Sequence, residues 1–172
     1  NLIVLGPLIY AIHHFEEHTI FNFIEWKLQY FQHSAAALST EAILAILTCI
    51  LVSFALLHLV KNNRASAHVI LFMLFAIQVI NAFYHIFFSF YFSDFSPGAI
   101  TAALLYLPVN FLIAQAAFRE GYLKSYFEYG CIAFLGTTTF VLFEIIGPLI
   151  IGLAIIFSLM YYFYFNKRLS NK

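Results

Sequence analysis

A cluster of ionisable side chains interrupts the apolar start of the chain, in the stretch HHFEEH at residues 13–18. Five of these six residues are histidine or glutamate. Imidazole nitrogens and carboxylate oxygens bind divalent transition metals, and a carboxylate can also act as a base toward water. The residue types therefore predict a metal site or an acid–base site.

Helical spacing divides the cluster into two sets. At 100° per residue, His13, Glu16 and Glu17 share one face, because they are spaced i, i+3 and i+4. His14 and His18 form a second pair one turn apart. The first set predicts a metal or water-activating site. The second, with Glu17, matches the H-x-x-E-H pattern of inverted zinc peptidases, and both interpretations stay open.

One helix supplies only part of a metal site, so other helices must contribute. His85 is the predicted additional ligand, and Asn81, one turn before it, is predicted to orient a ligand or contact substrate. Glu144 is a further candidate. Each also has a structural alternative: an interhelical hydrogen bond for His85 and Asn81, and an interfacial carboxylate for Glu144.

The elements that carry these residues are predicted to lie in a membrane. Hydrophobic residues make up 63% of the 172 residues and charged residues only 9%, whereas a soluble domain has about 25% charged residues. The net charge is zero and no basic tract occurs, so the predicted partner is the lipid bilayer and not nucleic acid. Cys49 and Cys131 lie in apolar runs and are predicted to be buried free thiols.

Apolar runs mark the predicted spans, because about 20 helical residues cross a hydrocarbon core of about 30 Å. Gly147-Pro148 divides the longest run, since proline begins helices well and continues them badly. The predicted fold is all-α: one transmembrane domain over residues 1–172, with about six membrane helices and an interfacial segment at 23–34. The predicted spans are residues 1–22, 41–60, 67–93, 99–118, 126–145 and 148–166.

The basic residues support this count. With six alternating spans, seven of the eight Lys and Arg residues fall on one side, and Lys27 falls on the other. Because cytoplasmic loops are rich in Lys and Arg, both termini are predicted to be cytoplasmic and the location to be the cell membrane. The seven residues are Lys61, Arg64, Arg119, Lys124, Lys167, Arg168 and Lys172.

This orientation places the candidate residues at a common depth. Residues 13–17 lie about 18–24 Å from the cytoplasmic end of the first span, at 1.5 Å per residue. The third and fifth spans also run outward, so Asn81, His85 and Glu144 fall in the same outer half. In the alternative, the first span ends at Ile12 and the cluster lies in water.

The stretch at residues 13–17 resembles the HXXEE family of membrane proteins. That family is described by an H-x-x-E-E motif near the N-terminus, a further histidine and a Y-x-P-G motif. The resemblance places the first motif on His13, Glu16 and Glu17, and makes His85 the natural second histidine.

The stretch FSPG at residues 95–98 resembles the Y-x-P-G motif, with Phe95 in place of the tyrosine. The Pro-Gly turn is retained. The resemblance implies a membrane location and favours the first interpretation of the cluster, but it implies no reaction.

The leading hypothesis is a metal-dependent membrane enzyme, with hydrolysis as the favoured reaction and a lipid-like or apolar substrate. His13, Glu16 and His85 would bind zinc or iron, and Glu17 would be a further ligand or the general base.

Two alternatives remain. In a metal-independent, glutamate-type intramembrane hydrolase, Glu16 and Glu17 would activate water together with Asn81 and His85. In a non-enzymatic ion or proton transporter or binding subunit, the buried ionisable residues would form a pathway or binding site. A chain of this length would then need an oligomer or a membrane partner.

Overall fold

A computed structural model of the chain describes residues 2–31 and 39–170, which form helices and connecting turns without a strand among them. A 3-10 turn, η1 (Leu2–Val4), opens the described chain, and three π-helical turns follow: η2 (Glu16–Ile20), η3 (Phe75–Val79) and η4 (Ala102–Tyr106). The α-helices are α1 (Leu5–Phe15), α2 (Phe23–Tyr30), α3 (Thr40–Lys61), α4 (Arg64–Leu74), α5 (Ile80–Tyr91), α6 (Ala99–Thr101), α7 (Leu107–Arg119), α8 (Tyr126–Ile146) and α9 (Leu149–Ser170).

Local sequence signals set several helix boundaries. The Ser39 hydroxyl accepts a hydrogen bond from a backbone N–H in the first turn of α3. Asn63 and Ser66 form a reciprocal capping box at the start of α4. Gly147, with φ of +91°, ends α8 directly before Pro148. The predicted division of the longest apolar run at this Gly-Pro pair is therefore confirmed.

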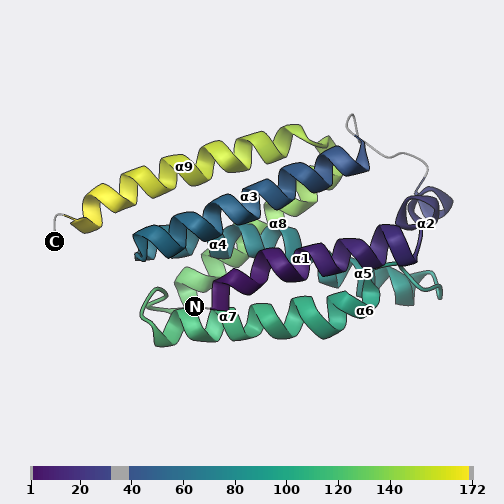
Figure 1. Cartoon of the computed structure of the whole chain (residues 1–172), viewed down its shortest axis with the longest axis horizontal. Helices are drawn as coiled ribbons and strands as arrows, with labels where there is room; N and C mark the ends of the chain where they lie inside the picture. The colour runs from purple at the N-terminus through teal and green to yellow at the C-terminus, as the bar shows by residue number, and fades with distance from the viewer. Residues whose placement is uncertain (1, 32–38, 171–172) are drawn as a thin grey trace.

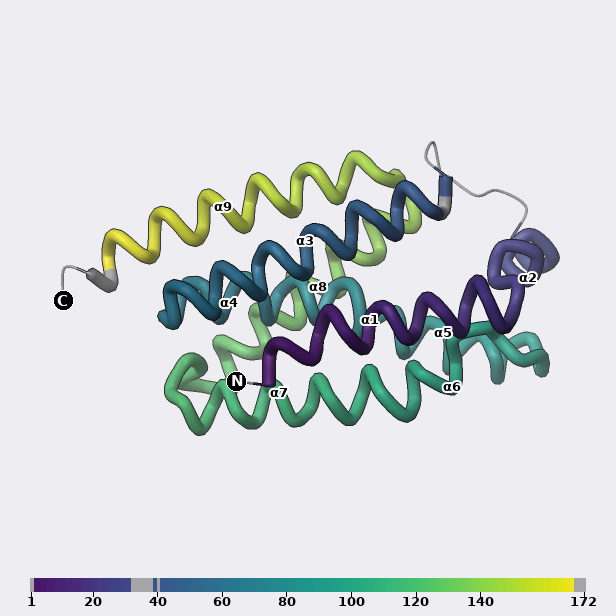
Figure 2. The backbone as a smooth tube through the Cα atoms, in the orientation of Figure 1, coloured from purple at the N-terminus to yellow at the C-terminus, as the bar shows by residue number. Residues whose placement is uncertain are grey.

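The segment α4–η3–α5 is one long helix and is the most buried of the long helices. It contacts α3, α7, α8 and α9 through α4 and η3. Helix α1 packs against α3 on one side and against η4 and α7 on the other. Figures 1 and 2 show α1 and the α6–α7 segment side by side, running in opposite directions. The end of α1 therefore meets the start of α6 and the end of α5.

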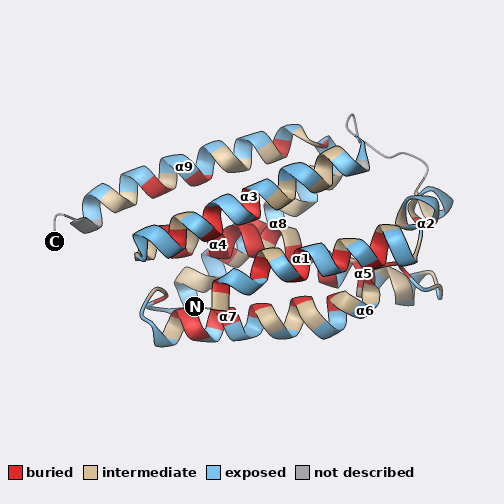
Figure 3. Ribbon diagram, viewed as in Figure 1, coloured by how far each residue is buried: buried red, intermediate tan, exposed pale blue. Residues whose placement is uncertain are grey.

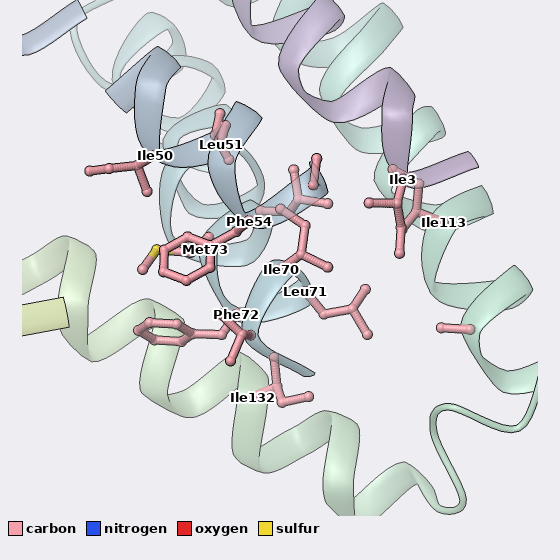
Figure 4. Close-up of a cluster of buried hydrophobic side chains, with 14 of the residues drawn as sticks. Ile3, Ile50, Leu51, Phe54, Ile70, Leu71, Phe72, Met73, Ile113 and Ile132 are labelled. Atoms are coloured by element: carbon pink, nitrogen blue, oxygen red, sulfur yellow. The ribbon is translucent and has the colours of Figure 1, made fainter. Parts of the chain in front are cut away.

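The apolar core lies between α3, α4 and their neighbours (Figure 4). Leu51 and Ile70 are fully buried, and Phe54, Met73 and Ile132 pack around them. Because lipid is as apolar as leucine, such packing in a membrane stabilises the bundle through van der Waals contact more than through transfer out of water.

The outward faces of α8 and α9 carry exposed, large apolar side chains, and most of α9 is coloured as exposed or intermediate in Figure 3. Phe134, Ile145 and Phe163 are examples. A surface of this kind suits contact with lipid. Cys49 and Cys131 are free thiols as predicted, but both are exposed. The prediction that they are buried was wrong, because an apolar run does not show which of its residues face outward.

Five helices are long and apolar enough to cross a membrane. They support a membrane protein, and they match the second to sixth predicted spans. The helical segment from η1 through η2, Leu2–Ile20, is not among these five, so a count of six stays a prediction. The predicted interfacial segment contains α2, whereas residues 32–34 lie outside the described part of the chain.

The basic loops meet at one end of the bundle. Arg64 pairs with Glu128 and donates a hydrogen bond to the Tyr122 carbonyl. The Asn63 amide donates to the Asn166 side chain at 3.0 Å. The start of α1 and the end of α9 lie at this same end (Figure 1). The segments predicted to be cytoplasmic are thus gathered together, and the side of the membrane they face stays a prediction.

Helix α2 lies at the opposite end (Figure 1). Its Tyr30 hydroxyl donates to the Asp94 carboxylate at 2.9 Å, which raises the pKa of Tyr30 above its usual value. Its Lys27 ammonium lies 2.9 Å from a Glu144 carboxylate oxygen of α8. These two contacts fix α2 against the turn after α5 and against α8.

Candidate functional site

The HHFEEH residues lie where α1 passes into η2, at the end opposite the basic loops. The other helices that meet there also carry π turns: η3 directly precedes α5, and η4 directly follows α6. A π turn adds one residue to a helical turn and re-aims the side chains around it, and such turns are frequent at functional sites.

Three predicted side chains meet in a buried group. Glu17 Oε1 lies 3.0 Å from His85 Nε2 and 3.5 Å from His13 Nε2. All three residues are buried, and one potential ligand atom of each lies within 4.8 Å of the others. Ligand atoms that share one cation at about 2.0–2.2 Å stand about 2.9–3.5 Å apart. Both distances from Glu17 Oε1 fall in this range, so the group is a candidate cation site.

Hydroxyl groups contact His13 and His85 at Nδ1, the ring nitrogen that does not face Glu17. His13 Nδ1 lies 2.8 Å from Thr101 Oγ1, and His85 Nδ1 lies 3.0 Å from Ser96 Oγ. In each ring the other nitrogen, Nε2, has no hydrogen bond of acceptable geometry among the described residues. Metal-binding histidines are held in this way, with the second nitrogen anchored and the first directed at the metal.

Gly98 forms the floor of the site. Its φ is +96°, in the left-handed region that favours glycine. A Cβ atom on this residue would lie 2.8 Å from His13 Cε1 and 2.9 Å from Glu17 Cγ. The Pro-Gly motif is therefore needed for close approach of the backbone to the site as well as for the turn. Phe95, in the tyrosine position of the motif, is exposed and packs against Phe21.

Glu16 has a different place from the one predicted. Its Oε1 accepts the Gly98 and Ile100 N–H groups at 3.2 Å each, and its Oε2 accepts the Thr101 N–H at 2.7 Å. These N–H groups belong to the start of α6, where a helix attracts negative charge. Glu16 thus caps a helix, and no group of potential ligands among the described residues includes it. The prediction that Glu16 is a metal ligand stays a prediction, and sequence reasoning did not foresee this capping role.

His14 and His18 form a second group with the same glutamate. Glu17 Oε2 lies 3.5 Å from His14 Nδ1 and 3.8 Å from His18 Nε2. Potential ligand atoms of these three residues also lie within 4.8 Å of one another. The two interpretations of the HHFEEH stretch therefore meet at Glu17 and do not exclude each other.

A cavity of about 280 Å³ opens beside the two groups. Its volume is close to the lower limit of about 300 Å³ for small-molecule sites. His13, Glu17, His14 and His18 reach its wall. Most of the remaining wall is apolar and comes from α3, η3, α8 and α9, including Ile43, Leu47, Ile50, Ile77, Phe140, Phe143, Ile150 and Ile151.

The two other predicted residues also line this cavity. The Asn81 Oδ1 atom is buried and has no hydrogen-bond partner within the described chain. Glu144 is paired with Lys27 at the cavity wall. Neither belongs to a group of potential ligands among the described residues, so contact with a substrate stays the prediction for both.

Sequence reasoning missed Ser96, Thr101 and Lys27, which contribute to the site. The two hydroxyl residues flank the Pro-Gly motif in SPGAIT at residues 96–101. Their closeness to the motif was the available signal. Tyr106 was also missed; it is fully buried and its ring lies 4.3 Å from the His13 ring.

The buried amides outside the site serve helix packing. Asn110 donates to Gln78 at 2.8 Å, and Gln78 donates to the Gly6 carbonyl at 2.7 Å. This chain of hydrogen bonds joins α7, η3 and α1, as expected for polar residues between membrane helices. It holds the helices whose far ends form the site.

The model of a family described as protein of unknown function with HXXEE motif matches residues 4–113. The chain belongs to this family. The matched range holds both groups of potential ligands and the Pro-Gly floor, whereas α8 and α9, which complete the cavity, lie outside it. The H-x-x-E-E motif of the family thus comprises two residues of the buried group, His13 and Glu17, and the capping residue Glu16. No curated protein and no solved structure matches the chain.

Proposed function

We propose that this HXXEE protein is a metal-dependent membrane enzyme that hydrolyses a lipid-like or otherwise apolar substrate. His13, Glu17 and His85 would hold a divalent transition metal, zinc or iron. The observation that carries the proposal is the buried His13–Glu17–His85 group beside a mainly apolar cavity.

The hydrogen bonds around His13 favour a cation. The Thr101 hydroxyl can donate its single proton to the Gly98 carbonyl at 3.3 Å, and it then accepts a proton from His13 Nδ1 at 2.8 Å. Nε2 of the neutral ring then carries a lone pair, and it faces the Glu17 carboxylate. Two acceptors facing each other in a buried site need a proton or a cation between them.

A bound divalent cation would polarise a carbonyl or phosphoryl oxygen of the substrate and lower the pKa of a bound water. Three protein ligands leave room for such a water, as in catalytic zinc sites. The Gly98 backbone and the Tyr106 ring close two sides of the group. Reactants are therefore expected to enter from the cavity side.

The cavity supports an apolar substrate. Its Lys, Glu and His residues lie in the HHFEEH stretch and in the Lys27–Glu144 pair, and aliphatic and aromatic residues form most of the remaining wall. A substrate with its scissile bond at His13 and Glu17 would place an apolar chain along α3, α8 and α9. The Lys27–Glu144 pair and Asn81 would contact a polar group of the substrate.

The proposed location is the cell membrane, with the lipid bilayer as partner and both termini cytoplasmic. The clustering of basic residues at one end supports this orientation. The site would then open in the outer half of the bilayer. The proposal also allows the chain to form an oligomer or to bind a further membrane protein.

The test is metal analysis of the full chain purified in lipid nanodiscs, combined with hydrolysis assays. We expect tightly bound zinc or iron, and turnover of long-chain acyl esters, amides or phosphoesters that is lost on chelation and restored by the metal. A short-chain ester is the control and should react poorly. Protein that binds neither metal after incubation with both would contradict the proposal.

One observation favours a second candidate, a metal-independent glutamate-type hydrolase. The 3.0 Å distance between Glu17 Oε1 and His85 Nε2 would let this pair share a proton and activate water directly. Asn81 would then orient the substrate. Chelator-resistant turnover by metal-free protein, lost in Glu17→Gln and His85→Gln, would select this candidate over the first.

A further inference from the structure

The two oxygens of Glu17 face two different pairs of histidines. Oε1 faces His13 and His85 at 3.5 and 3.0 Å, and Oε2 faces His14 and His18 at 3.5 and 3.8 Å. Four histidines around one buried carboxylate exceed what its single negative charge can balance if the rings are protonated. Neutral rings would instead offer four nitrogen lone pairs.

Helical geometry explains this arrangement. In an α-helix of 100° per residue, Glu17 would lie 40° from His13 on one side and 60° from His14 on the other. The distances to both histidines show that Glu17 keeps this place between them at the start of the π turn η2. His18 follows one turn after His14, and their ring centroids are 4.7 Å apart. His85 comes from α5 and completes only the first pair. Glu17 is therefore the one residue of the HHFEEH stretch that reaches both faces.

The second pair also has the features of a ligand set. His14 Nδ1 is buried, and it has no hydrogen-bond partner in the described part of the chain. His18 lies at the cavity wall with a partly exposed side chain. Both nitrogens face the same carboxylate oxygen, and the three potential ligand atoms lie within 4.8 Å of one another.

From this geometry we infer that Glu17 bridges two divalent cations. The first is bound by His13, His85 and Glu17 Oε1, and the second by His14, His18 and Glu17 Oε2. This inference rests on the proposed metal-dependent function and adds a second cation to it. Each cation has three protein ligands, and so each keeps open positions for water and substrate.

Paired cations fit the proposed hydrolysis. Cations bridged by one group in two-metal hydrolases lie about 3.5–4 Å apart and clamp the attacking and the leaving oxygen of the substrate. Here the second position lies at the cavity wall, through His14 and His18, where a substrate would arrive. The first position lies deeper, against the Gly98 backbone and beside Tyr106. The pair would thus present one buried and one accessible cation.

The test is titration of the metal-free full chain, purified in nanodiscs, with Co²⁺. We expect two Co²⁺ per chain by elemental analysis and a magnetically coupled pair by electron paramagnetic resonance. His18→Ala and His14→Ala should each lower the stoichiometry to one and produce the spectrum of an isolated Co²⁺ ion. If His14→Ala fails to fold, His18→Gln provides the same test at a more exposed side chain.

The matched control is His68→Gln. His68 is also partly buried, but both of its ring nitrogens have partners, and it lies at the basic end. This variant should keep two Co²⁺ per chain. If the wild type binds one Co²⁺ per chain and the His14 and His18 variants also bind one, the inference of a second cation is overturned and the proposed function stays intact. No bound Co²⁺ in the wild type would overturn both.

Discussion

The two ends of the bundle both enclose histidines, but they satisfy them in different ways. At the basic end, His68 Nδ1 lies 2.6 Å from the Tyr161 hydroxyl and its Nε2 lies 2.8 Å from the Tyr122 carbonyl. At the other end, His13 and His85 each anchor Nδ1 on a hydroxyl and turn Nε2 toward a carboxylate.

The charges differ in the same way. At the basic end the Arg64 guanidinium faces the Glu128 carboxylate, so a cation and an anion balance each other. At the site, Glu17 faces imidazole nitrogens and no Lys or Arg pairs with it in the described part of the chain. His58 Nε2 also lacks a partner, but both groups of potential ligands among the described residues exclude it. A cluster in which positive and negative charges balance holds helices together without a further ion. A cluster with more hydrogen-bond acceptors than donors is stabilised by bound cations.

Glu17→Gln should break the site most completely. It removes the negative charge that both groups share, so we expect loss of bound metal and a fall in turnover of more than about 100-fold. The secondary structure should be retained. Metal content by elemental analysis and turnover by the long-chain ester assay check this, and full metal occupancy in this variant would show that Glu17 is not a ligand.

Gly98→Ala should come next, because its new methyl group would enter the site. A positive φ costs a non-glycine residue roughly 1–2 kcal/mol, and the clash with His13 and Glu17 adds about 1–3 kcal/mol. We expect a lower thermal unfolding temperature together with loss of metal. Gly121→Ala is the matched control: its φ is +76°, and an added Cβ would meet nothing within 4 Å. That variant should lose stability only and keep its metal.

Thr101→Val should weaken the site without removing a ligand. It deletes the hydroxyl that holds His13 Nδ1, and loss of such a supporting hydrogen bond lowers metal affinity about 10–100-fold. Isothermal titration of the metal-free protein with Zn²⁺ measures the change. Thr138→Val removes a hydroxyl whose hydrogen bond, within the described residues, goes to the carbonyl four residues earlier in its own helix. The metal affinity of this variant should equal that of the wild type.

Glu16→Gln should separate capping from metal binding. The variant keeps the size of the side chain but loses the charge at the start of α6, which lowers the free energy of unfolding by about 0.5–2 kcal/mol. Because Glu16 caps a helix, the number of bound metals should not change. A loss of metal as large as in Glu17→Gln would restore Glu16 as a ligand.

Arg64→Gln should have the smallest effect and should leave the site untouched. It removes the ion pair with Glu128. The Arg64 and Glu128 side chains are 22% and 30% exposed, and partly exposed pairs contribute about 0–1 kcal/mol to stability. We expect a slight decrease in unfolding temperature, with metal content and turnover unchanged. Reduced metal binding in this variant would mean that the two ends are coupled.

Much of the architecture was predictable from the sequence. The second to sixth apolar runs correspond to the five long apolar helices, and the break fell at Gly147-Pro148, because length, hydropathy and proline chemistry are local properties. The first run was harder. Its cluster of ionisable residues makes it differ from an ordinary span, and Leu2–Ile20 is not among the five long apolar helices, so the six-span count stays a prediction.

Within the site, the pattern of the HHFEEH stretch indicated the residue types, and the polar residues of the third predicted span indicated His85. The helical spacing of the HHFEEH stretch predicted that Glu16 and Glu17 share a face with His13, but it did not predict which glutamate faces His85. That depends on where the start of α6 lies, since its free N–H groups bind the Glu16 carboxylate and leave Glu17 toward the histidines.

The sequence by itself therefore determined the five long apolar helices, the break at Gly147-Pro148, the gathering of basic residues on alternate loops and the presence of a His/Glu cluster. All of these follow from hydropathy, periodicity and spacing along the chain. Only the tertiary structure decided that Glu17 stands between four histidines, that Glu16 caps α6 and that Gly98 forms the floor. Apart from the contacts of Glu17 with the nearby His13, His14 and His18, those contacts join the α1–η2 segment to residues more than 60 positions away, and they depend on how the helices pack.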